Sequence, residues 1–231
     1  MPRFDHVLIV GAGEGLSASL ARAFAREGAT IALAARRPEK LESLCRELGA
    51  TAHRCDAAEP ADVAALFREL DEAGRTPAAV VYNPSRRSRG PFVDLDPEEV
   101  RQDLLVTAYG GFLVAQEAVR RMLPRREGAV VFPGASASVK GYARSSSFAM
   151  GKFALRGLAQ SMAREFQPQG IRVVHLVIDG GIRNPGRTEP ADRPDSMLDP
   201  DAIAATCLDL LRQPRSAWTW EVELRPWIET F

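Results

Sequence analysis

VLIVGAGEGL, residues 7–16, is the stretch that decides the fold. Its first four residues form an apolar, mostly β-branched run that is typical of a buried strand, and three glycines follow within five positions. Residues 16–27 then have the apolar spacing of a helix. Strand, glycine turn and helix together predict a phosphate-binding turn, because glycine permits a tight turn and the helix N-terminus attracts an anion. The spacing from Gly11 to Gly15 is shorter than Gly-x-Gly-x-x-Gly, with Ser17 where a further glycine often stands.

The same alternation of short apolar runs and longer helical segments continues to the end of the chain. The predicted strands are 7–10, 30–34, 51–54, 78–82, 128–132, 172–178 and 216–224, and the predicted helices are 16–27, 38–48, 60–73, 97–122, 147–166 and 200–212. This order predicts an α/β fold, a doubly wound parallel sheet flanked by helices on both faces. We expect a single domain over residues 1–231, since neither a linker nor a repeat divides it. Residues 183–197, rich in Pro, Gly and charge, predict a mobile loop.

Composition argues against several classes of partner. Hydrophobic residues make up 45% and charged residues 26%, and 30 basic side chains balance 30 acidic ones, so we expect no nucleic acid and no membrane partner. The basic runs at 86–89 and 120–126 are interpreted as solvated charge. Three cysteines without Cys-x-x-Cys spacing and three scattered histidines predict neither a disulfide framework nor a metal site. With no signal or membrane segment apparent, we expect a cytoplasmic protein.

Further motifs resemble the short-chain dehydrogenase/reductase family over nearly the whole chain. They are, in order, the glycine turn, Tyr82-Asn83-Pro84-Ser85 in place of Asn-Asn-Ala-Gly, Val106-Thr107-Ala108-Tyr109-Gly110, the helix bearing Lys152, and Asp179-Gly180 in place of Pro-Gly. The resemblance implies a Rossmann-type fold and an oxidoreductase. It also implies a nicotinamide dinucleotide cofactor that exchanges hydride with a carbonyl or alcohol substrate.

The resemblance also implies NADP(H) in preference to NAD(H). The family's acidic residue at the end of the second strand is Ala35 here, and Arg36 and Arg37 follow directly. A guanidinium group suits a ribose 2′-phosphate, whereas an acidic side chain suits the free hydroxyl. Asp56 matches the family's aspartate at the adenine. The expected cofactor-binding residues are Gly11, Gly13, Glu14, Gly15, Leu16, Arg36, Asp56, Asn83, Lys152 and Gly180.

The family's proton chemistry is mostly replaced. A tyrosine four residues before the lysine normally protonates the alkoxide, and positions i and i+4 share one helix face. Here Lys152 remains, but the tyrosine position is Phe148, the serine position is Ala135, and the helix-bending asparagine position is Thr107. Ser136 is one residue from the serine position, and on an extended segment neighbouring side chains point to opposite sides, so we do not expect it to act as a substitute.

Three functions are compatible with these replacements. The first is a reductase with a substitute proton donor, for which Tyr142 has suitable chemistry; other candidates are Tyr82, Tyr109, Ser145, Ser146, Ser147 or a water molecule. The second is a dinucleotide-binding sensor or regulatory subunit without turnover, which the retained cofactor residues favour. The third is an interaction protein that binds no dinucleotide, against which the intact glycine turn argues. The replacements also resemble a bacterial subgroup of the family with loop 134–138, helix 148–152 and a Ser-Ala-Trp-Thr strand at 216–219.

Two expectations concern partners. The helix 147–166 carries more apolar residues than one sheet-facing stripe needs, and the resemblance implies that such helices pair between subunits, so we expect a homodimer or homotetramer. A deeply buried helix in a monomer is the alternative. The loop 183–197 holds three arginines, which hint at an anionic ligand, but three acidic residues lie among them, and the sequence does not identify the substrate.

Overall fold

A computed structural model describes residues 4–229 and contains one parallel sheet. Its strands are β1 (His6–Val10), β2 (Thr30–Ala35), β3 (Thr51–Arg54), β4 (Ala79–Tyr82), β5 (Gly128–Pro133), β6 (Ile171–Ile178) and β7 (Glu221–Leu224). They lie in the order β3-β2-β1-β4-β5-β6-β7, and every neighbouring pair is parallel. The order reverses between β1 and β4, where open sheets of this kind bind their ligands. The predicted doubly wound α/β sheet is confirmed.

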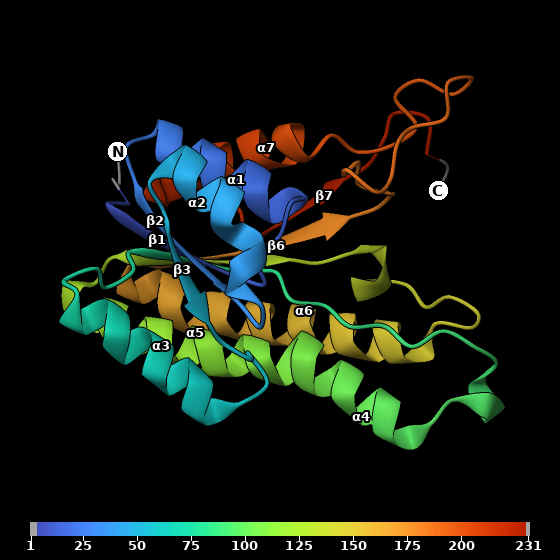
Figure 1. Cartoon of the computed structure of the whole chain (residues 1–231), viewed down its shortest axis with the longest axis horizontal. Helices are drawn as coiled ribbons and strands as arrows, with labels where there is room; N and C mark the ends of the chain where they lie inside the picture. Colours follow the sequence, from blue (N-terminus) through green and yellow to red (C-terminus); the bar gives the residue numbers. More distant parts are fainter. Residues whose placement is uncertain (1–3, 230–231) are drawn as a thin grey trace.

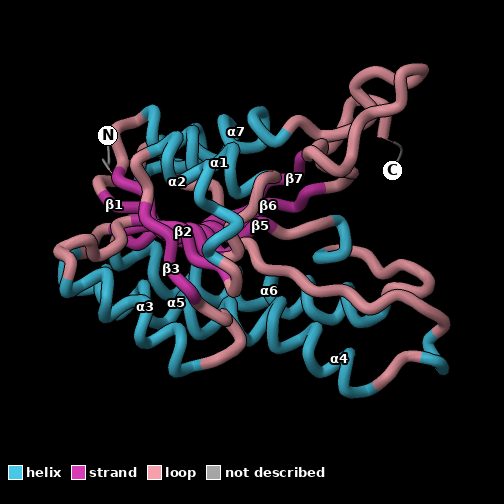
Figure 2. Tube along the Cα trace, in the orientation of Figure 1, coloured by secondary structure: helices cyan, strands magenta, loops and turns pink. Residues whose placement is uncertain are grey.

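Helices cover both faces of this sheet. They are α1 (Leu16–Arg26), α2 (Glu42–Leu48), α3 (Pro60–Glu72), α4 (Pro97–Leu104), α5 (Gly110–Met122), α6 (Ser146–Phe166) and α7 (Pro200–Arg212). Figure 1 shows α1, α2 and α7 on one face and α3, α4, α5 and α6 on the other, and Figure 2 shows the strands as the layer between them. Within residues 4–229, none of the helices combines the length and apolar content that crossing a membrane requires.

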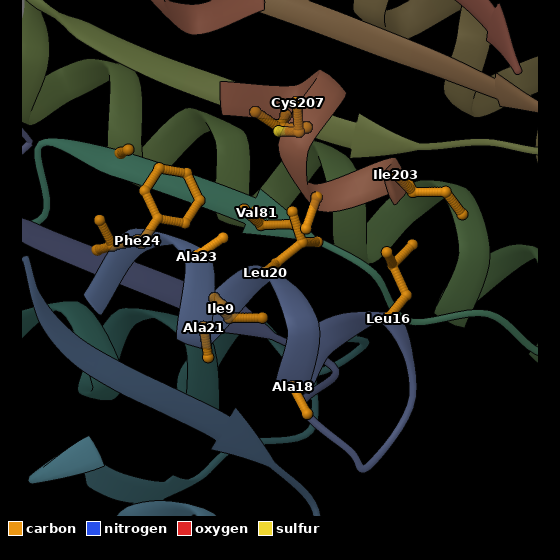
Figure 3. Packing of buried hydrophobic residues seen from close by; sticks show 14 of the residues in the cluster. Ile9, Leu16, Ala18, Leu20, Ala21, Ala23, Phe24, Val81, Ile203 and Cys207 are labelled. Carbon is orange, nitrogen blue, oxygen red and sulfur yellow. The ribbon is translucent and has the colours of Figure 1, made fainter. Parts of the chain in front are cut away.

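The alternation of side chains along the strands produces a separate core on each face. In β1, Val7 and Ile9 pack with α1 and α7, whereas Leu8 and Val10 pack on the opposite face with α3, α5 and α6. Figure 3 shows the first core, in which Phe24 and other side chains of α1 lie close to the sheet and to α7. Burying each large apolar side chain stabilises the fold by about 1.5–3 kcal/mol. The sheet is therefore held rigidly from both sides.

The last strand is shorter than the sequence predicts. Its predicted start at residue 216 is wrong, because Arg215–Ala217 forms a 3₁₀ turn and β7 begins at Glu221. Gln213 explains the difference: its side-chain Oε1 accepts a hydrogen bond from the Thr219 N–H, and its backbone carbonyl accepts one from the Trp218 indole. These bonds hold the approach to β7 in a turn rather than in the sheet.

The predicted helix 97–122 contains an internal π-helical turn, Leu105–Tyr109, between α4 and α5. The buried Tyr82 hydroxyl donates a hydrogen bond to the Val106 carbonyl at 2.5 Å, which draws that carbonyl away from the regular helix pattern. Thr107 lies in this turn, and its Oγ1 accepts a hydrogen bond from the Arg86 N–H at 3.2 Å. Such turns are common at functional sites. The irregularity is thus present although the family's asparagine is not.

Another predicted helix, 38–48, is divided in two. Pro38–Leu41 forms a 3₁₀ turn, and only Glu42–Leu48 is α-helical. The helix ends at Gly49, whose φ of 62° allows the left-handed conformation that closes many helices. The shortened helix leaves Lys40 and Leu41 beside the end of β2, where they line a cleft.

Candidate functional site

Two clefts open at the carboxyl ends of the strands. The first, of about 790 Å³, is lined by residues that follow β1, β2, β3 and β4. The second, of about 590 Å³, is lined by residues that follow β4, β5 and β6 and by α6. Asn83 and Ser85 line both, so the clefts meet beside the switch point between β1 and β4. No group of three or more His, Cys, Asp or Glu side chains within residues 4–229 is arranged to hold a metal ion.

The glycine turn forms one wall of the first cleft. Gly11 has a φ of 76°, and a Cβ added there would lie 2.5 Å from the Pro84 nitrogen, so glycine is required by both backbone and space. The turn is held by Ser17, whose Oγ donates to the Gly11 carbonyl at 3.0 Å and accepts from Asn83 Nδ2 at 2.8 Å. No atom lies within 4 Å of a Cβ built at Gly13, which leaves room for a ligand to approach the backbone.

The helix after this turn can attract an anion. Helix α1 begins at Leu16 without a side-chain cap, and its first turn contains no acidic residue. The first N–H groups of a helix lack partners within the helix and carry its partial positive charge. The geometry therefore fits a phosphate or pyrophosphate group, as the glycine pattern predicts.

The opposite wall of the first cleft is cationic. Arg36, Arg37 and Lys40 follow β2 and line it, beside Ala35, and no carboxylate in residues 4–229 forms an ion pair with any of the three. Asp56 lines the cleft at the end of β3, and its Oδ1 accepts a hydrogen bond from the Ala58 N–H at 3.1 Å. This wall can hold a further phosphate group at a distance from the glycine turn.

Lys152 is buried in the wall of the second cleft. It is only 4% exposed, and its Nζ donates to the Pro133 carbonyl at 3.0 Å. Burial lowers the pKa of Lys152 to about 8. Its Nζ lies 5.9 Å from the centre of the Phe148 ring, so the predicted i and i+4 residues share one face of α6. The ring carries no hydroxyl to meet a substrate.

Of the four predicted positions of the reaction centre, Ala135, Phe148 and Lys152 line this second cleft, and Thr107 does not. Ala135, Tyr142 and Phe148 all line it, together with Gly15, Leu16 and Gly180. Ser136 lines it as well. The strand alternation that argued against Ser136 does not apply, because Ser136–Ser138 is a 3₁₀ turn rather than an extended segment. The lining residues whose side chains carry a hydroxyl group are Ser85, Ser136 and Tyr142.

A lysine that sequence reasoning missed accompanies Tyr142. The Lys140 Nζ lies 5.7 Å from the centre of the Tyr142 ring and donates a hydrogen bond to Asp179 at 3.2 Å. Hydrogen bonds with Asp179 and Tyr142 raise the pKa of Lys140. The family pattern places the lysine four residues after the tyrosine on a helix, whereas Lys140 precedes Tyr142 on a loop. Of the other tyrosines, buried Tyr82 is bonded to Val106, and Tyr109 stacks on Phe112 away from both clefts.

A second missed residue is Arg87. Its guanidinium carbon lies 4.8 Å from the centre of the Phe148 ring, and it lines the second cleft. The basic run 86–89 was interpreted as solvated charge; Arg87 and Arg89 are exposed to solvent, whereas for half-buried Arg86 that interpretation is wrong. Arg86 is hydrogen-bonded to Glu99 and Asp103, so the two adjacent arginines have different roles. Their place just after Asn83, at the end of a central strand, was the available signal.

Comparison with known proteins agrees with the fold. Residues 5–190 match the short chain dehydrogenase family. The chain belongs to this family of oxidoreductases, whose members bind NAD(H) or NADP(H). The oxidoreductase UcpA of Escherichia coli is 28% identical over 221 residues, which cover 93% of this chain and 83% of that protein. UcpA of Salmonella typhimurium is 31% identical over 204 residues, covering 83% and 76%.

Solved structures show the same architecture. A short-chain dehydrogenase from Rhodopseudomonas palustris has a TM-score of 0.81 and 33% identity, with 96% of this chain and 98% of that chain covered. An alcohol dehydrogenase from the archaeon Thermococcus sibiricus, complexed with 5-hydroxy-NADP, has a TM-score of 0.84 and 24% identity, with 97% and 98% covered. The second likeness supports the fold alone.

Proposed function

We propose that this chain binds NADP(H) in preference to NAD(H) and acts as an oxidoreductase on a carbonyl or alcohol substrate through a non-standard active site. One observation carries the cofactor preference. Arg36, Arg37 and Lys40 line the first cleft without carboxylate partners in residues 4–229, and Ala35 stands where an acidic residue would favour a ribose hydroxyl. A cationic wall favours a ribose 2′-phosphate.

The remaining predicted cofactor residues divide between the two clefts. In the first, Gly11, Gly13 and Glu14 would lie along the pyrophosphate and Asp56 at the adenine. In the second, Lys152 would hold the nicotinamide ribose; Gly15, Leu16 and Gly180 line the same cleft, and Asn83 lines both. The bound nicotinamide supplies or accepts the hydride. The chain's own part is to bind and orient both reactants and to provide the proton.

For that proton we propose Tyr142. Neither Phe148 nor Ala135 carries an exchangeable proton, whereas the Tyr142 phenol lines the same cleft. The Lys140 ammonium beside the ring would stabilise the phenolate that remains after the proton has moved to the substrate alkoxide. Asp179, bonded to Lys140, fixes the position of that ammonium. The three residues would replace the usual tyrosine and lysine pair as proton donor.

A second candidate function is a dinucleotide-binding sensor or regulatory subunit without turnover. The observation that favours it is the contrast between a complete cofactor wall and a reaction centre in which positions 107, 135 and 148 have changed together. Both functions require the same cofactor site. Reduction of carbonyl compounds by the NADPH-bound protein distinguishes them, because the sensor would bind NADPH and consume none.

The test of cofactor binding is a titration of cofactor-free protein with NADPH and NADH in parallel, followed by nicotinamide fluorescence. We expect NADPH to bind at least tenfold more tightly than NADH. Replacing Arg36 by alanine should weaken NADPH about tenfold and leave NADH unchanged, because a hydrogen bond to a charged group contributes about 1.5–3 kcal/mol. Equal affinities for the two cofactors would refute the preference.

Arg46→Ala is the matched control for that titration. Arg46 is an exposed arginine on neighbouring α2 that does not line the first cleft. We expect its NADPH affinity to equal that of the unmodified protein. The same loss in Arg46→Ala as in Arg36→Ala would mean that the effect is general surface charge rather than a contact with the 2′-phosphate. Absence of binding by either cofactor would favour an interaction protein.

We also propose that the protein forms a homodimer or homotetramer through α5 and α6. Phe112 on α5 and Met150 and Phe153 on α6 are 42%, 49% and 46% exposed, which is unusual for large apolar side chains on adjacent helices. A second copy of the chain would cover the exposed apolar residues of α5 and α6 at once. Light scattering at micromolar concentration should give a mass at least twice 25.2 kDa. A monomeric mass would overturn this proposal.

A cytoplasmic location remains a proposal that rests on the cysteines. Cys45, Cys55 and Cys207 are all free thiols, and the last two are buried. Burial raises the pKa of each of these two to about 12, which disfavours the reactive thiolate. Free thiols suit a reducing compartment. Fractionation of cells that produce the protein, with a periplasmic marker as control, would test the location.

A further inference from the structure

The loop that carries Arg87 is anchored on both sides. Asp103, fully buried on α4, accepts hydrogen bonds from the Arg86 guanidinium at 3.1 Å and from the Ser88 N–H at 2.6 Å. Ser147, fully buried on α6, donates to the Ser88 carbonyl at 3.1 Å. The residues before and after Arg87 are therefore tied to two helices through buried polar groups, which fixes the backbone from which its side chain extends.

This anchoring directs Arg87 to the reacting end of the second cleft. Ser147 immediately precedes Phe148, so the bond that holds the loop also ties it to the ring over which the guanidinium lies. No carboxylate in residues 4–229 pairs with Arg87, whereas the adjacent Arg86 is paired with both Glu99 and Asp103. Arg87 is exposed to solvent, so its guanidinium is accessible to a ligand; partial desolvation and the positive charge of Arg89 lower its pKa.

The other charges of the second cleft leave it positive. Asp179 is paired with Lys140 at 3.2 Å, and Arg183 is paired with Asp199 at 2.6 Å. The lining groups that lack such partners are the cations Arg87, Lys152 and Arg187 and one carboxylate, Glu229. Three positive charges against one negative charge attract an anion into the cleft. In the sequence, the arginines of loop 183–197 are balanced by acidic neighbours. In the structure, Arg183 is paired with a carboxylate, whereas Arg187 lines the cleft without one.

We infer that the substrate carries an anionic group, a carboxylate or a phosphate, and that Arg87 binds this group beside Phe148. The inference rests on the proposed function, since it assigns the substrate class of the same site. The guanidinium carbon lies over the aromatic ring, and its N–H groups, which have no carboxylate partner in residues 4–229, would make a two-point contact with the oxygens of the anion. The anionic group would then orient the substrate carbonyl within the cleft.

The test uses calorimetric titration of the protein saturated with NADP⁺, with which a ketone cannot be reduced. The probes are two matched pairs, 4-oxopentanoate with its methyl ester and dihydroxyacetone phosphate with dihydroxyacetone. We expect at least one anionic probe to bind tenfold or more tightly than its neutral partner. Arg87→Gln should remove that tenfold preference and leave the affinity for NADP⁺ within twofold. No preference in either pair would overturn the inference.

Arg89→Gln is the matched control, because Arg89 lies on the same loop but does not line the cleft. We expect it to retain the preference within twofold; a loss equal to that of Arg87→Gln would overturn the inference. A tenfold weakening of NADP⁺ in Arg87→Gln would also overturn it, by assigning Arg87 to the cofactor phosphates. If the unmodified protein fails to bind NADP⁺, the proposed cofactor function fails by itself. The same probe pairs, titrated without cofactor, then decide the inference.

Discussion

The two clefts differ in what forms their walls. The first is formed by a glycine turn, a helix N-terminus and three cations whose positions follow directly from their places after β1 and β2. The second is formed by side chains from the ends of three strands, from α6 and from the irregular segment after β6. In the first, Gly11, Gly13, Glu14, Arg36, Asp56 and Asn83 of the predicted cofactor residues lie together. In the second, the phenol of the family's tyrosine is absent, and Arg87 lies over the ring of Phe148, which stands in its place.

The comparison teaches that binding and reaction depend on different parts of the same fold. Backbone N–H groups and a rigid turn bind phosphate whatever substrate is used, so that wall is independent of the chemistry performed. Proton transfer depends on single side chains, and replacing one of them changes the reaction without disturbing the sheet. Phe148 and Ala135 still fill their places in the wall, while the hydroxyls of the family pattern are missing.

The largest expected effect comes from restoring the missing hydroxyl. Phe148→Tyr would place a phenol four residues before Lys152 on the face of α6 that lines the cleft. A positioned acid contributes about 10²–10⁴-fold in rate, so we expect NADPH-dependent reduction of a panel of aldehydes and ketones to rise about 100-fold. Spectrophotometric measurement of NADPH consumption gives the rate.

Phe92→Tyr is the control for that gain, because Phe92 is exposed and lines neither cleft. It should leave the rate unchanged. Tyr142→Phe, made in the unmodified protein, should abolish any turnover that exists before Phe148 is replaced. A rate in Phe148→Tyr no higher than in Phe92→Tyr would show that the second cleft differs from the family by more than a hydroxyl.

A somewhat smaller effect concerns Lys152 and pH. Burial lowers its pKa to about 8 from the usual 10.5, so between these values the unfolded chain holds a proton that the folded protein has released. The free energy of unfolding should therefore rise with pH across this window, by up to about 3 kcal/mol. Below pH 8 the folded protein carries the buried charge at its full cost. Lys152→Met should remove this rise in urea unfolding measured across the window.

The decisive quantity in that experiment is the difference in free energy of unfolding between the unmodified protein and Lys152→Met at each pH. Burial raises the pKa of Cys55 and Cys207, which lowers stability as pH rises through the alkaline range, and this opposing effect is common to both proteins. Lys140→Met is the control, since Lys140 is an exposed lysine and should leave the rise in place. Identical pH profiles for the unmodified protein and Lys152→Met would contradict the burial of the ammonium.

The smallest effect concerns the glycine turn. Gly11→Ala would meet both the left-handed backbone and the Pro84 nitrogen, so we expect the free energy of unfolding to fall by about 2 kcal/mol and NADPH to bind about tenfold more weakly. Gly74→Ala is the matched control, with a φ of 67° and no atom within 4 Å of the added Cβ. It should lower stability by about 1 kcal/mol without affecting NADPH. If Gly11→Ala and Gly74→Ala lost the same NADPH affinity, the glycine turn would not be part of the cofactor site.

How far the sequence predicted each region follows from the range of the interactions involved. The strand, turn and helix of residues 7–26 could be predicted because each depends on neighbours within a few positions. The position of Phe148 and Lys152 on one face of a helix could be predicted, because helix geometry alone places residues i and i+4 together. The start of β7 could not, since the Gln213 side chain competes there with the sheet.

By itself the sequence determined the α/β fold, the glycine turn with its cationic neighbours, and the loss of the phenol at position 148. Only the tertiary structure decided that Arg87 lies over Phe148 and that Lys140 lies beside Tyr142. Arg87 and Phe148 are 61 positions apart in the chain and meet because buried Ser147 bonds to the loop at Ser88. Contacts of this kind depend on how separate elements pack, and no local pattern of residues records them.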